Sequence, residues 1–235
     1  MIIGILQCDD VTEELQQSYG NYPQMFTQLF AALEKDLKFN VYCVTEGQYP
    51  LSIHECDAYI LTGSRFGVND VHEWISKLEG FVLELYQANK KLIGICFGHQ
   101  MIVKALGGVV ETSSKGWGLG VSTTQVKVVQ QWMHQGQNEI SLVVSHQDQV
   151  KLLPQGSKIL ASSDFCPFYM IQINGHFLGI QGHPEFSKDY SYDFMQAKRA
   201  SIPRKCIQAG IASLASNIDD RLVARWLINF IKQAI

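Results

Sequence analysis

The stretch Gly94-Ile95-Cys96-Phe97-Gly98-His99-Gln100 decides how this chain folds. It ends an apolar run, Lys91-Leu92-Ile93, and precedes a helical pattern of apolar residues that Gly107-Gly108 ends. The expected order is therefore a strand, a sharp turn and a helix, with the cysteine at the turn. Glycines on both sides permit a strained turn and a close approach of the helix to the strand. The pattern G-x-C-x-G is thus the thiol counterpart of the G-x-S-x-G nucleophile elbow.

Cys96 has two interpretations. A lone cysteine at the end of a strand is often part of the core, because cysteine is among the most buried residue types. The flanking glycines and the following helix favour a nucleophile. The N–H groups of that helix's first turn would stabilise a thiolate and a developing oxyanion. We therefore expect Cys96 to be a nucleophile.

A second motif, Gln181-Gly182-His183-Pro184-Glu185, follows the strand-like run Phe177-Leu178-Gly179-Ile180. A cysteine nucleophile needs a base, and the base needs a group that orients it. His183 can take the thiol proton, and Glu185 lies on the same side of an extended segment, where it can bond the imidazole. His99 is the alternative base, but the sequence places no carboxylate near it.

Together these motifs resemble the class I glutamine amidotransferases, which have a Cys-His-Glu triad in this chain order. The resemblance covers nearly the whole length and rests on GICFGHQ at 94–100, SHQD at 145–148 and GHPE at 182–185. Within the family, the chain is most similar to stand-alone GMP-synthase-like members and to plant-type γ-glutamyl peptidases. The resemblance implies that Cys96 attacks the γ-carbonyl of glutamine or of a γ-glutamyl compound, forming a thioester that releases glutamate.

The oxyanion hole is expected at two backbone amides. One is that of Phe97, directly after the nucleophile, and the other is that of Gly63, in the loop after the strand Tyr59-Ile60-Leu61-Thr62. Members of the family often have G-G-P or G-S-P in this loop, whereas this chain has Gly63-Ser64-Arg65. The missing proline leaves the rigidity of the loop open. Arg65 either points to solvent or binds a carboxylate of a larger substrate.

The resemblance also implies which residues hold the glutamyl group. Gln100 lies one helical turn after Cys96, on the same face of the helix. The segment SHQD would hold the α-amino and α-carboxylate groups, and its candidate binding residues are Ser145, His146 and Gln147. Trp117 is expected at the rim of the pocket, because the glycine-rich stretch around it precedes a strand-like segment and not the helix of a dinucleotide loop.

The alternation of strand-like and helical patterns predicts an α/β fold. We expect a three-layer, flavodoxin-like, mostly parallel central sheet with flanking helices and a small antiparallel flap, in a single amidotransferase domain over 1–235. Early strands are expected at 2–7, 40–44, 57–62 and 91–95, and helices at 22–37 and 71–89, with an irregular segment at 9–20. Asp70 and Glu73 predict a capping-box start for the second of these helices. Later strands are expected at 121–129, 141–145, 158–162, 168–173 and 177–181. A C-terminal helical segment is expected over 187–235, with breaks at Pro203 and near Ser216.

Composition limits the functional classes. The chain has 235 residues, is 46% hydrophobic and carries a net charge of −3, which argues against nucleic acid as the main partner. No pair of its six cysteines has C-x-x-C spacing, so we expect neither a metal site nor another cofactor. Scattered cysteines and the absence of a signal-peptide pattern favour the cytoplasm, and no apolar run approaches the ~18 residues of a membrane span. The histidines without a motif, His54, His72, His134 and His176, are expected at the surface.

Three functions compete. The first is a stand-alone hydrolase, the second a glutaminase subunit that supplies ammonia to a synthase partner in trans, and the third a non-catalytic regulatory module. The intact Cys96, His183 and Glu185 argue against the third. No phosphate-binding loop of an ATP-dependent synthase follows in the chain, which favours the first. Basic residues of the C-terminal segment form either a solvated face or a docking surface: Lys188, Lys198, Arg199, Arg204 and Lys205.

Overall fold

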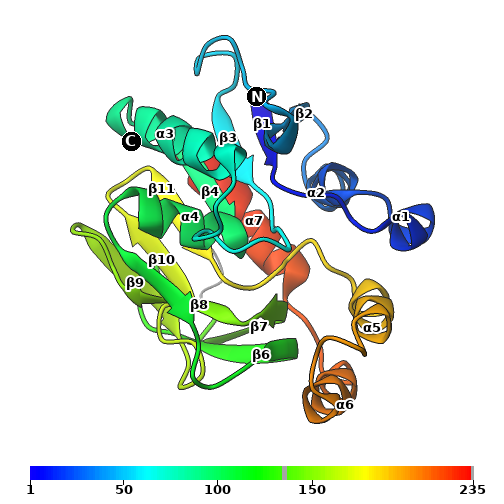
Figure 1. The fold of residues 1–235 in the computed structure, drawn as a ribbon. Coiled ribbons are helices and arrows are strands. Elements are labelled where there is room, and N and C mark those ends of the chain that lie inside the picture. Colours follow the sequence, from blue (N-terminus) through cyan, green and yellow to red (C-terminus); the bar gives the residue numbers. More distant parts are fainter. Residues whose placement is uncertain (134–136, 234–235) are drawn as a thin grey trace.

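The computed structural model describes residues 1–133 and 137–233 (Figure 1). Within them, a nine-stranded sheet has the order β2-β1-β3-β4-β11-β10-β9-β6-β7. One half is parallel and consists of β2 (Lys38–Cys43), β1 (Ile2–Gln7), β3 (Ala58–Leu61), β4 (Lys91–Ile95) and β11 (Phe177–Ile180). Strands β3, β4 and β11 are fully buried, as expected for parallel strands covered by helices on both faces.

The other half of the sheet is antiparallel. It consists of β10 (Met170–Ile173), β9 (Ser157–Ser162), β6 (Gly118–Val126) and β7 (Glu139–His146). A separate two-stranded sheet pairs β5 (Val109–Thr112) with β8 (Asp148–Leu152), and neither of these strands was expected from the sequence. The antiparallel region is therefore a continuation of the main sheet as well as a flap.

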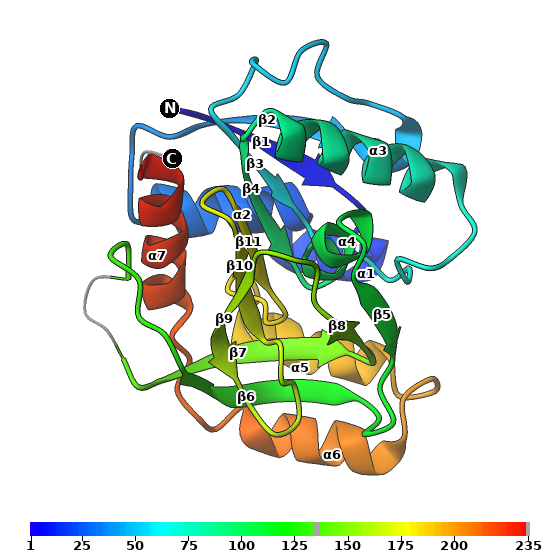
Figure 2. The same cartoon turned by 90° about the vertical axis from the view of Figure 1, so that its left-hand side faces the viewer.

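Helices cover both faces of the parallel half. On one face, α2 (Tyr22–Ala31) and α7 (Asp220–Lys232) share a core with Ile5 and Ile93. On the other face, α3 (Glu73–Gln87) and α4 (Phe97–Ala105) pack over Leu61. The remaining helices are α1 (Glu13–Tyr19), α5 (Lys188–Ala197), α6 (Arg204–Ser213) and the short 3-10 helix η1 (Val44–Glu46). Figure 2 shows α6 alongside β6, away from the parallel strands.

The predicted α/β fold is confirmed, and so are the breaks in the C-terminal helical segment. Three local predictions are wrong. A helix, α1, lies in the segment expected to be irregular, and α2 ends at Ala31 instead of continuing to 37. The capping box at Asp70 is also absent, since α3 begins at Glu73 with His72 at its N-cap. The Asp70 carboxylate instead accepts the Gly67 amide in the preceding loop, at 2.8 Å.

The histidines without a motif differ in exposure. His54 and His72 are exposed, as expected, whereas His134 lies outside the described residues. The prediction for His176 is wrong, because this residue is buried and its ring packs 5.0 Å from those of Tyr86 and Phe177. Aromatic packing at the start of β11 therefore draws this histidine into the core.

Candidate active site

The backbone at Cys96 is strained, as the elbow motif predicts. Cys96 joins β4 to α4 with φ 51° and ψ −99°, a region that residues with a side chain rarely adopt. A Cβ atom on Gly94 would lie 2.3 Å from the Gly98 carbonyl oxygen, and one on Gly98 would lie 2.5 Å from Leu61 Cβ. The two glycines therefore allow α4 to pack directly on the strands and hold the thiol at the carboxyl end of β4.

His183 and Glu185 form a buried pair behind the thiol. Their Nδ1 and Oε1 atoms are 2.7 Å apart, and the His183 amide donates to the Val143 carbonyl at 2.8 Å. The imidazole also stacks on Phe186, with ring centroids 4.0 Å apart and planes 5° apart. The ring is thus fixed by a carboxylate at its edge and by an aromatic face.

The pKa of His183 depends on the charge of Cys96. Burial by itself lowers the pKa of His183, but the charges of Glu185 and Cys96 outweigh this effect and raise that pKa to about 10. His183 therefore holds a proton readily when Cys96 gives one up. This is the behaviour expected of a base that accepts a thiol proton.

His99, the alternative base, has different surroundings. It is fully buried, and a Cβ atom on Gly179 would lie 2.4 Å from its Nδ1 atom, so the ring lies against β11. Burial, followed by the charge of His146, lowers the pKa of His99 to about 3. His99 therefore stays neutral at ordinary pH, which suits a packing residue better than a base.

Gln181 contacts the thiol directly, and the sequence assigned it no role. Its Nε2 group donates to Cys96 Sγ at 3.4 Å, while its Oε1 accepts from Gln100 Nε2 at 3.1 Å. The register of β4 and β11 pairs Ile95 with Ile180, the last residues of the two strands. Cys96 and Gln181 each follow one of these residues and therefore lie next to one another. Knowledge of this strand pairing would have identified Gln181.

A cavity of about 390 Å³ opens above the thiol and collects most of the expected site residues. Its wall includes Cys96, Phe97, Gln100, Ser145, His146, Gln147 and His183. Glu185 and Gly63 are not part of the wall. Glu185 lies behind His183, and a Cβ atom on Gly63 would lie 2.9 Å from His183 Cε1, so Gly63 sits against the imidazole.

Two of the expected substrate residues are already bonded within the chain. Gln100 Nε2 also donates to the Asp148 carbonyl, at 2.9 Å, so this side chain braces Gln181 as well as facing the cavity. His146 Nδ1 lies 3.1 Å from the same carbonyl oxygen. Burial lowers the pKa of His146 to about 4, so its ring is neutral at ordinary pH.

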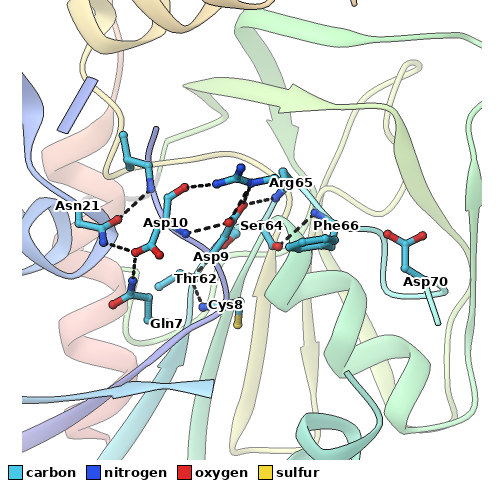
Figure 3. Close-up of polar contacts among 12 residues, drawn as sticks. Gln7, Cys8, Asp9, Asp10, Asn21, Thr62, Ser64, Arg65, Phe66 and Asp70 are labelled. Carbon is cyan, nitrogen blue, oxygen red and sulfur yellow. Dashed lines mark hydrogen bonds and ion pairs between the residues drawn. The ribbon is translucent and has the colours of Figure 1, made fainter. Parts of the chain in front are cut away.

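Arg65 fits neither of its two expected roles fully. Its side chain is 50% exposed, yet its Nε atom lies 2.8 Å from the buried carboxylate of Asp9. Its Nη2 group donates to the Asp10 carbonyl at 2.7 Å (Figure 3). Arg65 also lines the cavity. The arginine therefore links the loop after β3 to the segment after β1.

The outer wall of the cavity comes from segments to which the sequence assigned no site residues. Helix α1 and the turn before it contribute Thr12 and Leu15, and α5 with the turn after it contributes Phe194, Lys198, Ser201 and Ile202. Trp117 lies in the same wall, as expected for a rim residue. Lys198 thus belongs to the cavity, whereas Arg199, Arg204 and Lys205 are exposed.

Comparisons with known proteins agree with this architecture. The family model described as glutamine amidotransferase class-I matches residues 19–197. Gamma-glutamyl peptidase 4 of Arabidopsis thaliana is 30% identical over 232 residues, covering 94% of this chain and 92% of the relative. A subunit of the GMP synthase (glutamine-hydrolyzing) of Archaeoglobus fulgidus is 40% identical over 106 residues, covering 44% of this chain and 56% of that relative.

Solved structures share the fold. A glutamine amidotransferase from Thermotoga maritima superposes with a TM-score of 0.75 at 18% identity, covering 98% of this chain and 99% of that one. In the part of the chain that the structure describes, no helix is both long and apolar enough to cross a bilayer.

Proposed function

Because the chain belongs to the class I glutamine amidotransferase family, we propose that it is a stand-alone hydrolase of γ-glutamyl compounds. The reaction passes through a γ-glutamyl thioester on Cys96. One observation carries the proposal: a strained cysteine faces a cavity beside a buried histidine that a carboxylate orients.

Each proposed step uses a group of the site. His183, oriented by Glu185, takes the proton of the Cys96 thiol, and the sulfur attacks the γ-carbonyl carbon. The amides of Phe97 and Gly63 donate to the oxyanion. Protonated His183 then gives its proton to the departing amine. In the second half, His183 takes a proton from water, whose oxygen attacks the thioester, so that glutamate leaves and the thiol is restored.

Gln181 adds a function of its own to this proposal. An amide that donates to the sulfur fixes the position of Sγ for its attack on the carbonyl carbon. Gln100 keeps that amide in one orientation because it donates to the oxygen of the Gln181 side chain.

The size and chemistry of the cavity favour a γ-glutamyl peptide over glutamine. The leaving group of glutamine is ammonia, which is about the size of one water and has no apolar part. Beyond the thiol, the cavity of about 390 Å³ continues to a wall that includes Trp117, Phe194 and Ile202. These apolar side chains suit a leaving amine with an apolar part, such as an amino acid or a peptide.

Glutamate release by the purified chain tests the proposal. Glutamine and a series of γ-glutamyl dipeptides would be the substrates, with Cys96→Ala as the blank. We expect faster release from the dipeptides than from glutamine, at a rate that depends on the leaving amino acid. Absence of release from every γ-glutamyl dipeptide would refute the proposal.

A second candidate function is a glutaminase subunit that supplies ammonia to a synthase partner in trans. The similarity to the Archaeoglobus fulgidus protein favours it, because that relative is named as one subunit of a glutamine-hydrolyzing synthase. Release from glutamine alone would support this candidate. So would an inactive chain whose Cys96 is still labelled by a covalent glutamine analogue.

A further inference from the structure

We infer that Asp9 is a positioning residue that, with Arg65, holds the loop after β3 where the Gly63 amide can serve the oxyanion. The inference rests on the proposed hydrolase function and adds a residue to it. Asp9 lies in the segment that the sequence predicted to be irregular, and nothing in the motifs indicates it. Figure 3 shows its carboxylate directed from the segment after β1 towards Arg65 in the loop after β3.

The first support is that both oxygens of the Asp9 carboxylate are bonded to Arg65. The Arg65 amide donates to Asp9 Oδ2 at 2.7 Å, and the Arg65 Nε atom lies within 2.9 Å of both oxygens. The amide of Asp10 donates to Oδ1 at 2.8 Å, so Asp9 also shapes its own turn. Asp9 is 7% exposed, and a buried carboxylate is costly unless such partners compensate for the lost water.

The second support is that the loop is tied on both sides of Gly63. Before Gly63, the Thr62 amide donates to the Leu6 carbonyl at 3.2 Å, and Thr62 Oγ1 accepts the Cys8 amide at 2.9 Å. After Gly63, the tie is Arg65 to Asp9. Gly63 is therefore held between two anchors that both reach the end of β1.

The third support is the tight fit of Gly63 against the proposed base. A Cβ atom there would come within 2.9 Å of His183 Cε1, so a small movement of the loop changes its contact with the imidazole. Misplacement of a catalytic group by about 1 Å can cost roughly 100-fold in rate. Arg65 stands where members of the family often have a proline, so this loop needs another restraint. The Asp9 carboxylate supplies one by accepting from the Arg65 N–H group, which a proline would lack.

Asp9→Ala and Arg65→Ala test the inference, with Glu34→Gln as the matched control. Glu34, in the turn after α2, lies 2.6 Å from Lys232 at the end of α7, so its substitution breaks an ion pair outside the cavity. We expect Asp9→Ala to lower kcat for glutamate release roughly 10- to 100-fold with little change in KM. Arg65→Ala keeps the amide bond to Asp9 and should lose less. Alkylation of Cys96 by iodoacetamide needs no oxyanion hole and should keep its rate in both.

Hydrogen exchange provides a measurement that does not depend on turnover. The amides of 63–66 should exchange faster in Asp9→Ala, to a smaller degree in Arg65→Ala, and unchanged in Glu34→Gln. Unchanged exchange in both loop variants would overturn the inference, as would a kcat equal to that of the wild type. A parallel fall in alkylation and turnover would also overturn it, since that would indicate general disruption. If the wild type releases no glutamate at all, the proposed function fails, while the exchange result still decides whether Asp9 holds the loop.

Discussion

The inner and outer walls of the cavity are built in different ways. The inner wall includes residues that follow the carboxyl ends of adjacent strands: Cys96 follows β4, and His183 lies just after β11. Gln181, also just after β11, is buried and supports this wall from behind through its bond to Cys96 Sγ. The outer wall consists largely of side chains from α1 and α5, which lie on the same side of the molecule in Figure 1. A hydrogen bond of 2.6 Å from Tyr19 to Asp193 connects these two helices.

The two walls differ in how easily substitutions can change them. Backbone register and glycine packing position the inner wall, so its geometry changes little without unfolding the sheet. Side-chain contacts between segments distant in sequence position the outer wall, so substitutions can reshape it at lower cost. We therefore expect the inner wall to perform the reaction and the outer wall to select the leaving group.

Loss of the Cys96 thiol should lower glutamate release more than any other substitution. A smaller loss would contradict the assignment of the reaction to the inner wall. Cys96→Ala removes the proposed nucleophile, so glutamate release should fall to the background rate while the circular dichroism spectrum stays unchanged. Cys206→Ala, in α6, is the matched control and should keep its activity. Residual turnover in Cys96→Ala would show that the inner wall does not supply the nucleophile.

Loss of the orienting carboxylate should be the next largest effect. Glu185→Gln leaves the shape of the pair but removes the charge that raises the pKa of His183, so turnover should fall roughly 1,000-fold. The rate is measured with a γ-glutamyl dipeptide at saturation. An effect below about threefold would assign the orientation of His183 to Phe186 instead.

The same pair predicts a pH dependence of stability. The folded-state pKa of His183 is about 10, above its ordinary value of 6.5. Its contribution to the free energy of unfolding is therefore complete below pH 6.5 and is lost as the pH rises towards 10. Urea unfolding between these pH values should show the advantage of the wild type over Glu185→Gln shrinking as the pH rises. A constant difference would contradict the raised pKa.

The effects of two glycine substitutions on the free energy of unfolding test how tightly the inner wall is packed. Gly94→Ala forces a Cβ atom against the Gly98 carbonyl and should destabilise the protein by about 3 kcal/mol or more. Gly80→Ala, in α3, meets nothing within 4 Å and should stabilise it by about 0.5–1 kcal/mol. Urea unfolding measures both. Equal effects would mean that the elbow is not tightly packed.

A substitution in the outer wall should have the smallest effect, and only on some substrates. Trp117→Ala removes apolar surface from the cavity wall, so KM should rise roughly 10-fold for γ-glutamyl dipeptides with apolar leaving residues. Hydrolysis of glutamine by the same variant is the internal control and should keep its KM. Equal changes for both substrates would place Trp117 outside the region that selects the leaving group.

The sequence predicted the inner wall better than the outer wall for physical reasons. Glycines around Cys96 mark a strained turn, and the spacing of His183 and Glu185 places them on one side of an extended segment, so local patterns suffice. Helix α1 was missed because it is short and its seven residues, Glu13–Tyr19, include only two large apolar side chains, Leu15 and Tyr19, too few to establish a helical period. Tertiary contacts, including that of Tyr19 with Asp193, support it instead.

Other omissions have the same origin. Gln181 stood in a motif that was recognised, but its contact with the thiol depends on which strand lies beside β4. The role we infer for Asp9 depends on the spatial proximity of two loops that are 56 residues apart in the chain. Strand neighbours and loop contacts are tertiary facts, which a single sequence does not contain in its local pattern.

Direct detection of the thioester tests the central claim most directly. The purified chain would be mixed with a γ-glutamyl dipeptide, quenched in acid within the first turnovers and analysed by peptide mass spectrometry, with Cys96→Ala in parallel. Our account predicts a γ-glutamyl adduct on Cys96 that disappears as the substrate is consumed and is absent from the variant. Glutamate release without an adduct on Cys96, or with the adduct on another cysteine, would contradict it.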